Sequence, residues 1–156
     1  MIKHIFLTFI ALSVSVVTCA AMDRYYCAVD DSQLKLSIEA GFKEQSGWPL
    51  AHLRGIVVFK TEQGGGTGKT VQGVLMLDLD HIVQYWRDGR RMMIRASSRS
   101  GTGNDATDVD VLLDSKMVAG DINRFAGDYS IIVRPKGNHD PAFALTRDGK
   151  VSCSRF

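Results

Sequence analysis

The residues best suited to chemistry are a group of arginines near the middle of the chain. Arg91, Arg95 and Arg99 recur every four residues and therefore share one face of an extended strand. Arg87 and Arg90 extend the group toward the N-terminus. Guanidinium groups bind phosphates and carboxylates through paired hydrogen bonds. The spacing predicts a contact surface for an anionic glycan, a lipid head group or an acidic protein.

The segment that positions these arginines is predicted to be a β-hairpin. Residues 91–96 and 108–114 both alternate apolar and polar side chains, which is typical of strands with one buried face. One register satisfies both faces and places Arg95 opposite Asp110. Its other opposed pairs are Arg91–Asp114, Met92–Leu113, Ile94–Val111 and Ala96–Val109. The alternative role of the arginines is therefore ion pairing with Asp110 and Asp114 on a solvated face.

A second chemical candidate is His81, which lies among Asp78, Asp80 and Asp88 in the sequence. A histidine beside a carboxylate can act as a general base, so one alternative function is a small envelope hydrolase. However, the chain contains neither the His-Glu-x-x-His motif of zinc proteases nor the Gly-x-Ser-x-Gly motif of serine hydrolases. The sequence therefore predicts no catalytic residue, and it favours a binding protein over an enzyme.

Two loop segments match known ligand motifs only in part. Gln63–Thr70 ends in Gly-Lys-Thr, but a phosphate-binding loop requires glycine where Gln63 stands and a helix after it. A calcium loop starting at Asp105 would have Asp110 and Lys116 where glycine and glutamate are required. We therefore predict no cofactor and no metal ion, with a looser calcium site in Gly101–Asp108 as the alternative.

The N-terminus is predicted to be a secretory signal peptide covering residues 1–21. A lysine at position 3 precedes an uncharged apolar segment, Ile5–Val17, and small residues follow up to Ala21. Residues 22–156 then form a single domain that is exported to the bacterial periplasm or secreted. The alternatives are an uncleaved signal that anchors the chain in the membrane and a lipid anchor on Cys19.

Cleavage of the signal would leave two cysteines, Cys27 and Cys153, near the two ends of the domain. An even number of cysteines in an exported protein is typical of disulfide bonding. We therefore predict a Cys27–Cys153 disulfide, which requires the first and last strands to be neighbours. The two cysteines lack the close ligand spacing of a zinc site.

Strand patterns and turn signals predict an all-β fold, a single antiparallel β-sandwich or barrel-like domain of about eight strands. Besides the central hairpin, the predicted strands are Tyr25–Asp30, Gln33–Lys43, Leu53–Glu62, Val71–Leu79 and Asp128–Arg134, with a final hairpin of Ala142–Thr146 and Lys150–Arg155 around Asp148-Gly149. Asp80–Trp86 fits a short helix or a strand. Ser115–Ala126 is predicted to be a linker with one helical turn.

Composition narrows the function further. A formal net charge of +2 is too small for a general nucleic-acid binder. No apolar segment after the signal is long enough to span a membrane. Trp48, Tyr85 and Trp86 either line a sugar-binding platform or fill the core. The sequence thus favours an exported binding module, and a further alternative is an inhibitor-type domain that presents the loop Ser97–Ala106 to a foreign enzyme.

Overall fold

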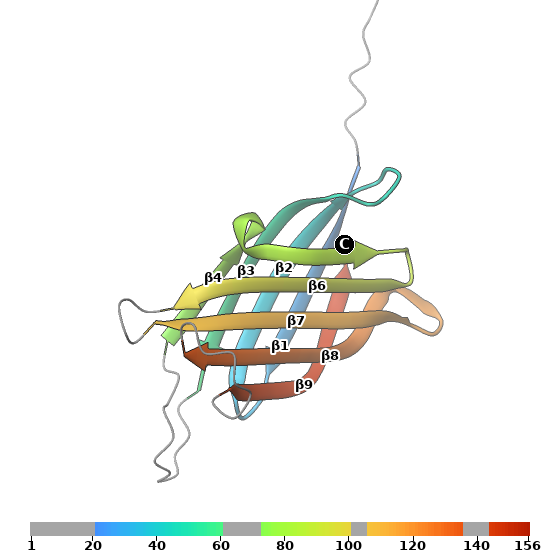
Figure 1. Cartoon of the computed structure of the whole chain (residues 1–156). Coiled ribbons are helices and arrows are strands. Elements are labelled where there is room, and N and C mark those ends of the chain that lie inside the picture. The colour runs from blue at the N-terminus through green and yellow to red at the C-terminus, as the bar shows by residue number, and fades with distance from the viewer. Residues whose placement is uncertain (1–20, 61–72, 101–105, 136–143) are drawn as a thin grey trace, which may run out of the picture.

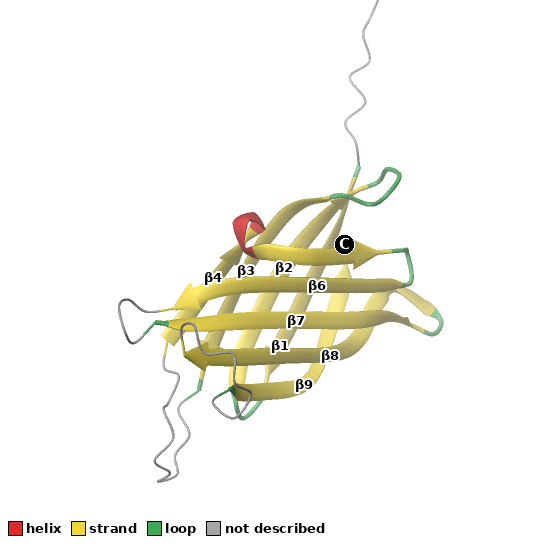
Figure 2. Ribbon diagram, viewed as in Figure 1, coloured by secondary structure: helices red, strands yellow, loops and turns green. Residues whose placement is uncertain are grey.

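The computed structural model of the protein describes residues 21–60, 73–100, 106–135 and 144–156. This part of the chain consists almost entirely of antiparallel strands, with one turn of 3-10 helix, η1 (Leu79–His81) (Figure 2). The strands are β1 (Met22–Asp30), β2 (Leu34–Lys43), β3 (Leu50–Phe59), β4 (Gly73–Asp78), β5 (Ile82–Arg87), β6 (Arg91–Ser100), β7 (Thr107–Val118), β8 (Asp121–Pro135) and β9 (Leu145–Arg155).

The strands form one sheet in the order β4-β3-β2-β1-β9-β8-β7-β6-β5. The sheet curls into a nearly closed barrel, in which β6, β7 and β8 cross in front of β1–β4 (Figure 1). Strands β4 and β5 are the two ends of the sheet and are joined through η1. The predicted all-β, barrel-like fold is confirmed.

The barrel is filled by side chains rather than hollow. Alternate residues of each strand point inward, as in β1, where every second residue from Asp23 to Val29 is buried. Tyr25 makes edge-to-face contacts with Phe42 and Phe125, at centroid distances of 5.8 and 5.2 Å. The largest fully buried side chains are Tyr25, Tyr129, Phe42, Phe125, Leu34, Leu36, Ile38, Met92, Ile94, Leu113, Ile131 and Val57.

A covalent link joins the first and last strands in the middle of the sheet. Cys27 lies opposite Cys153 in the β1–β9 pairing, and their Sγ atoms are 2.10 Å apart, at disulfide distance. Both residues are buried in the core. The predicted pairing and the adjacency of the terminal strands are therefore confirmed. The predicted signal peptide lies largely outside the described residues and stays a prediction.

The central hairpin exists as β6 and β7, but its predicted register is wrong by two residues. Arg95 lies opposite Leu112 rather than Asp110, and Ile94 lies opposite Leu113 rather than Val111. A shift of two residues keeps every side chain on its own face, whereas a shift of one would not. The alternation of the sequence therefore determines the faces of this hairpin but leaves its pairing ambiguous.

The linker predicted over Ser115–Ala126 is also wrong, because β7 and β8 continue through it and turn at Ala119-Gly120. Gly120 has φ +82°, which glycine adopts without steric cost. Asp80–Trp86, which fits either a short helix or a strand by sequence, contains both, because the helical turn η1 runs directly into the strand β5. The connector Ser97–Ala106 is shorter than predicted, because β6 extends to Ser100. Its residues 101–105, the loop Gln63–Lys69 and the turn Lys136–Pro141 lie outside the described residues.

The final hairpin around Asp148-Gly149 does not form, because both residues lie within the single strand β9. Gly149 is opposite Tyr129 on β8, and an added Cβ would come within 2.6 Å of the Tyr129 ring. The ring cannot easily move, since its hydroxyl donates a hydrogen bond to Asp31. Glycine is therefore needed here for a close approach rather than for a turn.

We expect Gly149→Ala to destabilise the protein by roughly 1–3 kcal/mol, because the new methyl group overlaps a fixed aromatic ring. Urea unfolding measures this change. Ser152→Ala, at an exposed position of the same strand, is the matched control and should stay within about 0.5 kcal/mol of the wild type. Equal stabilities of the two variants would contradict the close approach.

Candidate functional site

Arg91, Arg95 and Arg99 lie on the outer face of the barrel, and two of these three arginines are paired with aspartates. Arg91 donates from Nε to Asp114 Oδ1 at 2.8 Å, and its Nη2 also contacts that carboxylate. Arg99 Nε lies 2.9 Å from Asp108 Oδ1. Arg95 has no hydrogen bond or ion pair within the described residues. These contacts agree with the alternative of internal pairing for Arg91 and Arg99 and leave Arg95 available.

The shift in register does not by itself leave Arg95 without an ion pair among the described residues, because Arg91 reaches Asp114 across the equivalent diagonal. Asp110, its predicted partner, lies opposite Ser97 and pairs instead with Arg134 at 2.6 Å. A depression of about 310 Å³ surrounds Arg95. Its lining also includes the apolar side chains of Met93, Leu112 and Ile132. Of Arg91, Arg95 and Arg99, Arg95 is thus the best placed to contact an anion.

The Arg91–Asp114 pair makes stability depend on acid pH. The hydrogen bond from Arg91 lowers the pKa of the Asp114 carboxyl below its ordinary value. A carboxyl whose pKa is lower in the folded state stabilises the protein above its unfolded pKa of about 3.9, and this contribution disappears as the pH falls through the folded value.

We therefore expect Asp114→Asn to cost up to about 1 kcal/mol at neutral pH, because the pair is partly exposed, and almost nothing at pH of about 2. Urea unfolding of the wild type and the variant at both pH values measures the difference. A cost that is equal at the two pH values would show that the ion pair is not its source.

His81, the hydrolase candidate, has a local structural role. Its Nδ1 lies 2.7 Å from Asp78 Oδ1, and together the two side chains cap η1 at its N-terminus. The hydrogen bond from His81 lowers the pKa of Asp78. Within the described residues, no hydroxyl or thiol group hydrogen-bonds to His81. The histidine–aspartate contact that the sequence suggests is present, and it caps a helical turn.

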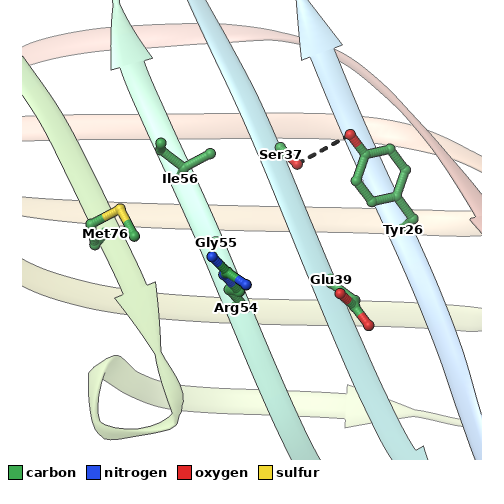
Figure 3. Close-up of a pocket in the computed structure, with 7 residues that line it drawn as sticks. All are labelled: Tyr26, Ser37, Glu39, Arg54, Gly55, Ile56 and Met76. Carbon is green, nitrogen blue, oxygen red and sulfur yellow. Dashed lines mark hydrogen bonds between the residues drawn. The ribbon is translucent and has the colours of Figure 1, made fainter.

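A different surface, on the outer face of β1–β4, gathers exposed apolar side chains. We define the β1–β4 patch as Tyr26, Arg54, Ile56, Val74 and Met76. Val74 and Met76 are 58% and 55% exposed, and Met76 lies directly opposite Ile56 in the β3–β4 pairing. Figure 3 shows four of these five residues, all except Val74, on one face of the sheet, beside a depression of about 250 Å³.

The cation of the β1–β4 patch, Arg54, has no ion-pair partner among the residues that the structure describes. Ser37 donates a hydrogen bond to the Tyr26 hydroxyl at 3.2 Å. Arg54 lies opposite both Glu39 and Asp78 in register, yet it forms no ion pair within the described residues. Glu39 lies 3.8 Å from Arg24 and from His52, whereas Asp78 contacts His81. The patch thus combines an exposed apolar area with a free guanidinium.

The sequence contains a signal for this patch. Ile56-Val57-Val58-Phe59 is apolar on both faces, a pattern typical of a strand that is covered on both sides. Strand β3 does lie between two others, but no element covers its outer face in the described part of the chain. An apolar outer face without a covering layer is a typical mark of an interaction surface.

Arg87 is the residue whose environment departs most from the sequence-based prediction. It lies opposite Met92 on the inner face, and its side chain is 1% exposed. Its Nη2 donates to Asp23 at 3.0 Å and also contacts the Tyr25 hydroxyl. Asp23 in turn binds Arg155 at 2.5 Å. Because these partners lie at opposite ends of the chain, spacing alone could not reveal the cluster.

Comparison with protein-family models, curated proteins and solved structures finds no match. Among the residues that the structure describes, no group of three or more His, Cys, Asp or Glu side chains could hold a metal ion. The described residues also contain no helix long and apolar enough to cross a membrane.

Proposed function

We propose that the protein is an exported, non-catalytic binding module whose main contact surface is the β1–β4 patch and whose partner is an acidic protein. The observation that carries this proposal is the unpaired Arg54 within an area of exposed Tyr26, Ile56 and Met76 side chains. Tyrosine, methionine and arginine are enriched in protein interfaces, and tyrosine and arginine contribute strongly to the binding energy.

The chemistry of the patch defines the partner. The apolar side chains require a complementary apolar surface, since burying them would provide most of the binding energy. Arg54 requires a carboxylate, because a guanidinium left unpaired in a buried interface is costly. The partner surface therefore has apolar side chains around an aspartate or glutamate. The Cys27–Cys153 disulfide supports an oxidising compartment for this encounter.

A second candidate function is binding of an anionic glycan or lipid head group at Arg95. It is favoured by the free guanidinium of Arg95 within its own depression. Three arginines acting together, as the sequence suggests, would first have to release Asp114 from Arg91 and Asp108 from Arg99. We therefore rank this surface below the β1–β4 patch.

Photo-cross-linking in the envelope tests the main proposal. A photoreactive phenylalanine analogue at position 26 replaces a tyrosine that is 46% exposed and keeps its aromatic shape. The same analogue at position 83 replaces Val83 on β5, which is 57% exposed and lies outside the patch. We expect a discrete cross-linked protein from position 26 and none from position 83.

Adding Met76→Asp to the position-26 protein should reduce the cross-linked product at least tenfold, because a charge replaces an apolar contact. Thermal unfolding of the variant checks that the barrel remains folded. Equal products from positions 26 and 83, or a product that Met76→Asp leaves unchanged, would contradict a contact through this patch.

A further inference from the structure

Arg87 lies in an aromatic box at the end of β5. The guanidinium carbon is 5.0 Å from the ring centroid of Tyr25 and 4.7 Å from that of Trp48. Phe125 contributes a third ring at 5.9 Å. Aromatic faces attract a cation, and these contacts hold the guanidinium in place. They do not provide hydrogen-bond acceptors for its N–H groups.

Two nitrogen atoms of this buried guanidinium have no partner. Nη2 is used by Asp23 and Tyr25, but Nε and Nη1 are buried without a hydrogen bond within the described residues. Unsatisfied donors of a buried cation are rare because they lose their water without compensation. Nη1 lies beside Gly89, close enough that a Cβ added to this residue would be 3.6 Å from it. Because glycine has no Cβ, the space next to Nη1 is not filled by a side chain from position 89.

The carboxylates around Arg87 do not reach its two unpartnered nitrogen atoms. The carboxylate of Asp23 is shared, with Oδ2 bound to Arg87 and Oδ1 bound to Arg155. Glu44 is the other acid near this pair, and it lies 4.0 Å from Arg155. The carboxylate of the adjacent Asp88 accepts hydrogen bonds from the backbone N–H groups of Arg90 and Arg91 in its own turn. These acids therefore leave Nε and Nη1 of Arg87 without an acceptor within the described residues.

The residue that covers Arg87 belongs to a surface loop. Trp48 lies in the loop between β2 and β3 and has φ +44°, a left-handed conformation that is unfavourable for a bulky side chain. Its indole packs on Arg87 and against the edge of the core, and its backbone is held by a short turn closed by a hydrogen bond from Trp48 N to Gln45 O. Movement of this indole would expose the guanidinium without disturbing the strands.

We propose that Arg87 is a binding site for a small oxyanion, a carboxylate or a phosphate-like group, which enters when the Trp48 indole moves aside. The oxyanion accepts hydrogen bonds from the unpartnered N–H groups of the buried guanidinium. This site faces the end of the barrel and is separate from the β1–β4 patch, so it does not depend on the proposed function.

Fluorescence of Trp48 tests the site. The chain has two tryptophans, so Trp86→Phe leaves Trp48 as the single reporter. We expect inorganic phosphate, sulfate or acetate to change its emission saturably and to raise the thermal midpoint, relative to chloride at equal ionic strength. Phosphate and sulfate acting without acetate would assign the site to phosphate-like groups, and the reverse would assign it to carboxylates.

Three variants in the Trp86→Phe background make the test specific. Arg87→Lys keeps the charge but loses the planar donor geometry, and it should weaken binding at least tenfold. Arg124→Gln removes an exposed cation of β8 and should leave binding unchanged. Trp48→Ala removes the cover and should keep the rise in thermal midpoint, which provides a readout if Arg87→Lys does not fold. The proposal would be overturned if none of the three anions changed the fluorescence or the thermal midpoint of the Trp86→Phe protein and none raised the midpoint of Trp48→Ala. Equal losses of anion affinity in Arg87→Lys and Arg124→Gln would also overturn it.

Discussion

Replacing both Cys27 and Cys153 with alanine should lower the free energy of unfolding by about 5 kcal/mol in the chain-entropy description of a disulfide. The magnitude follows from the separation of 126 residues between the two cysteines, because the bond restricts almost the whole unfolded chain. The bond also joins β1 to β9 in the middle of the sheet. Urea unfolding measures the loss.

Wild-type protein that is reduced while unfolded, and then blocked at its thiols, should reproduce the instability of the double variant. Reductant added to the folded wild type should have little effect, since both cysteines are buried. A double variant within about 1 kcal/mol of the wild type would mean that the bond contributes far less than the loop entropy predicts.

Asp23→Asn should destabilise the protein by about 3–5 kcal/mol, because it leaves the Arg87 guanidinium buried without its counter-ion. The Arg87 and Asp23 side chains are 1% and 5% exposed, so solvent cannot compensate for the lost charge. Arg155 and the Tyr25 hydroxyl lose their charged partner in the same substitution. Urea unfolding at neutral pH is again the measurement.

The matched control is Asp108→Asn, which removes the same charge from the Arg99–Asp108 pair on the outer face. The Arg99 side chain is 58% exposed, so this change should cost less than about 1 kcal/mol. Similar losses in the two variants would show that burial of the Arg87–Asp23 pair does not determine its contribution.

The sequence predicts the faces of the strands well, because alternation reports directly on burial. Leu34, Leu36 and Ile38 alternate with polar residues, and β2 forms over almost the expected range with these residues buried. Alternation cannot determine pairing, since a shift of two residues in β6–β7 preserves both faces. Glycine has two uses as well: Gly89, with φ +90°, forms a turn, whereas Gly149 admits the Tyr129 ring.

The candidate sites were harder to predict, because they depend on contacts between distant parts of the chain. Arg87 belongs to a surface group by spacing, yet its position opposite Met92 directs it into the core. Its partners Asp23 and Arg155 become neighbours only because β1 pairs with β9. Likewise, Tyr26 and Met76 share a face only in the folded sheet, so no local motif indicates the β1–β4 patch.

The measurement that tests the central claim most directly is the affinity for the protein cross-linked at position 26, compared between Arg54→Glu and Arg95→Glu. If the β1–β4 patch is the contact surface, Arg54→Glu should raise Kd at least tenfold, because glutamate repels the partner's carboxylate. Arg95→Glu should leave Kd within about twofold of the wild type, since Arg95 lies on β6, which is separated from β1–β4 by three strands in the sheet. An unchanged Kd in Arg54→Glu would contradict the account. An equal or larger rise in Kd in Arg95→Glu would also contradict it and would assign the contact to the surface around Arg95.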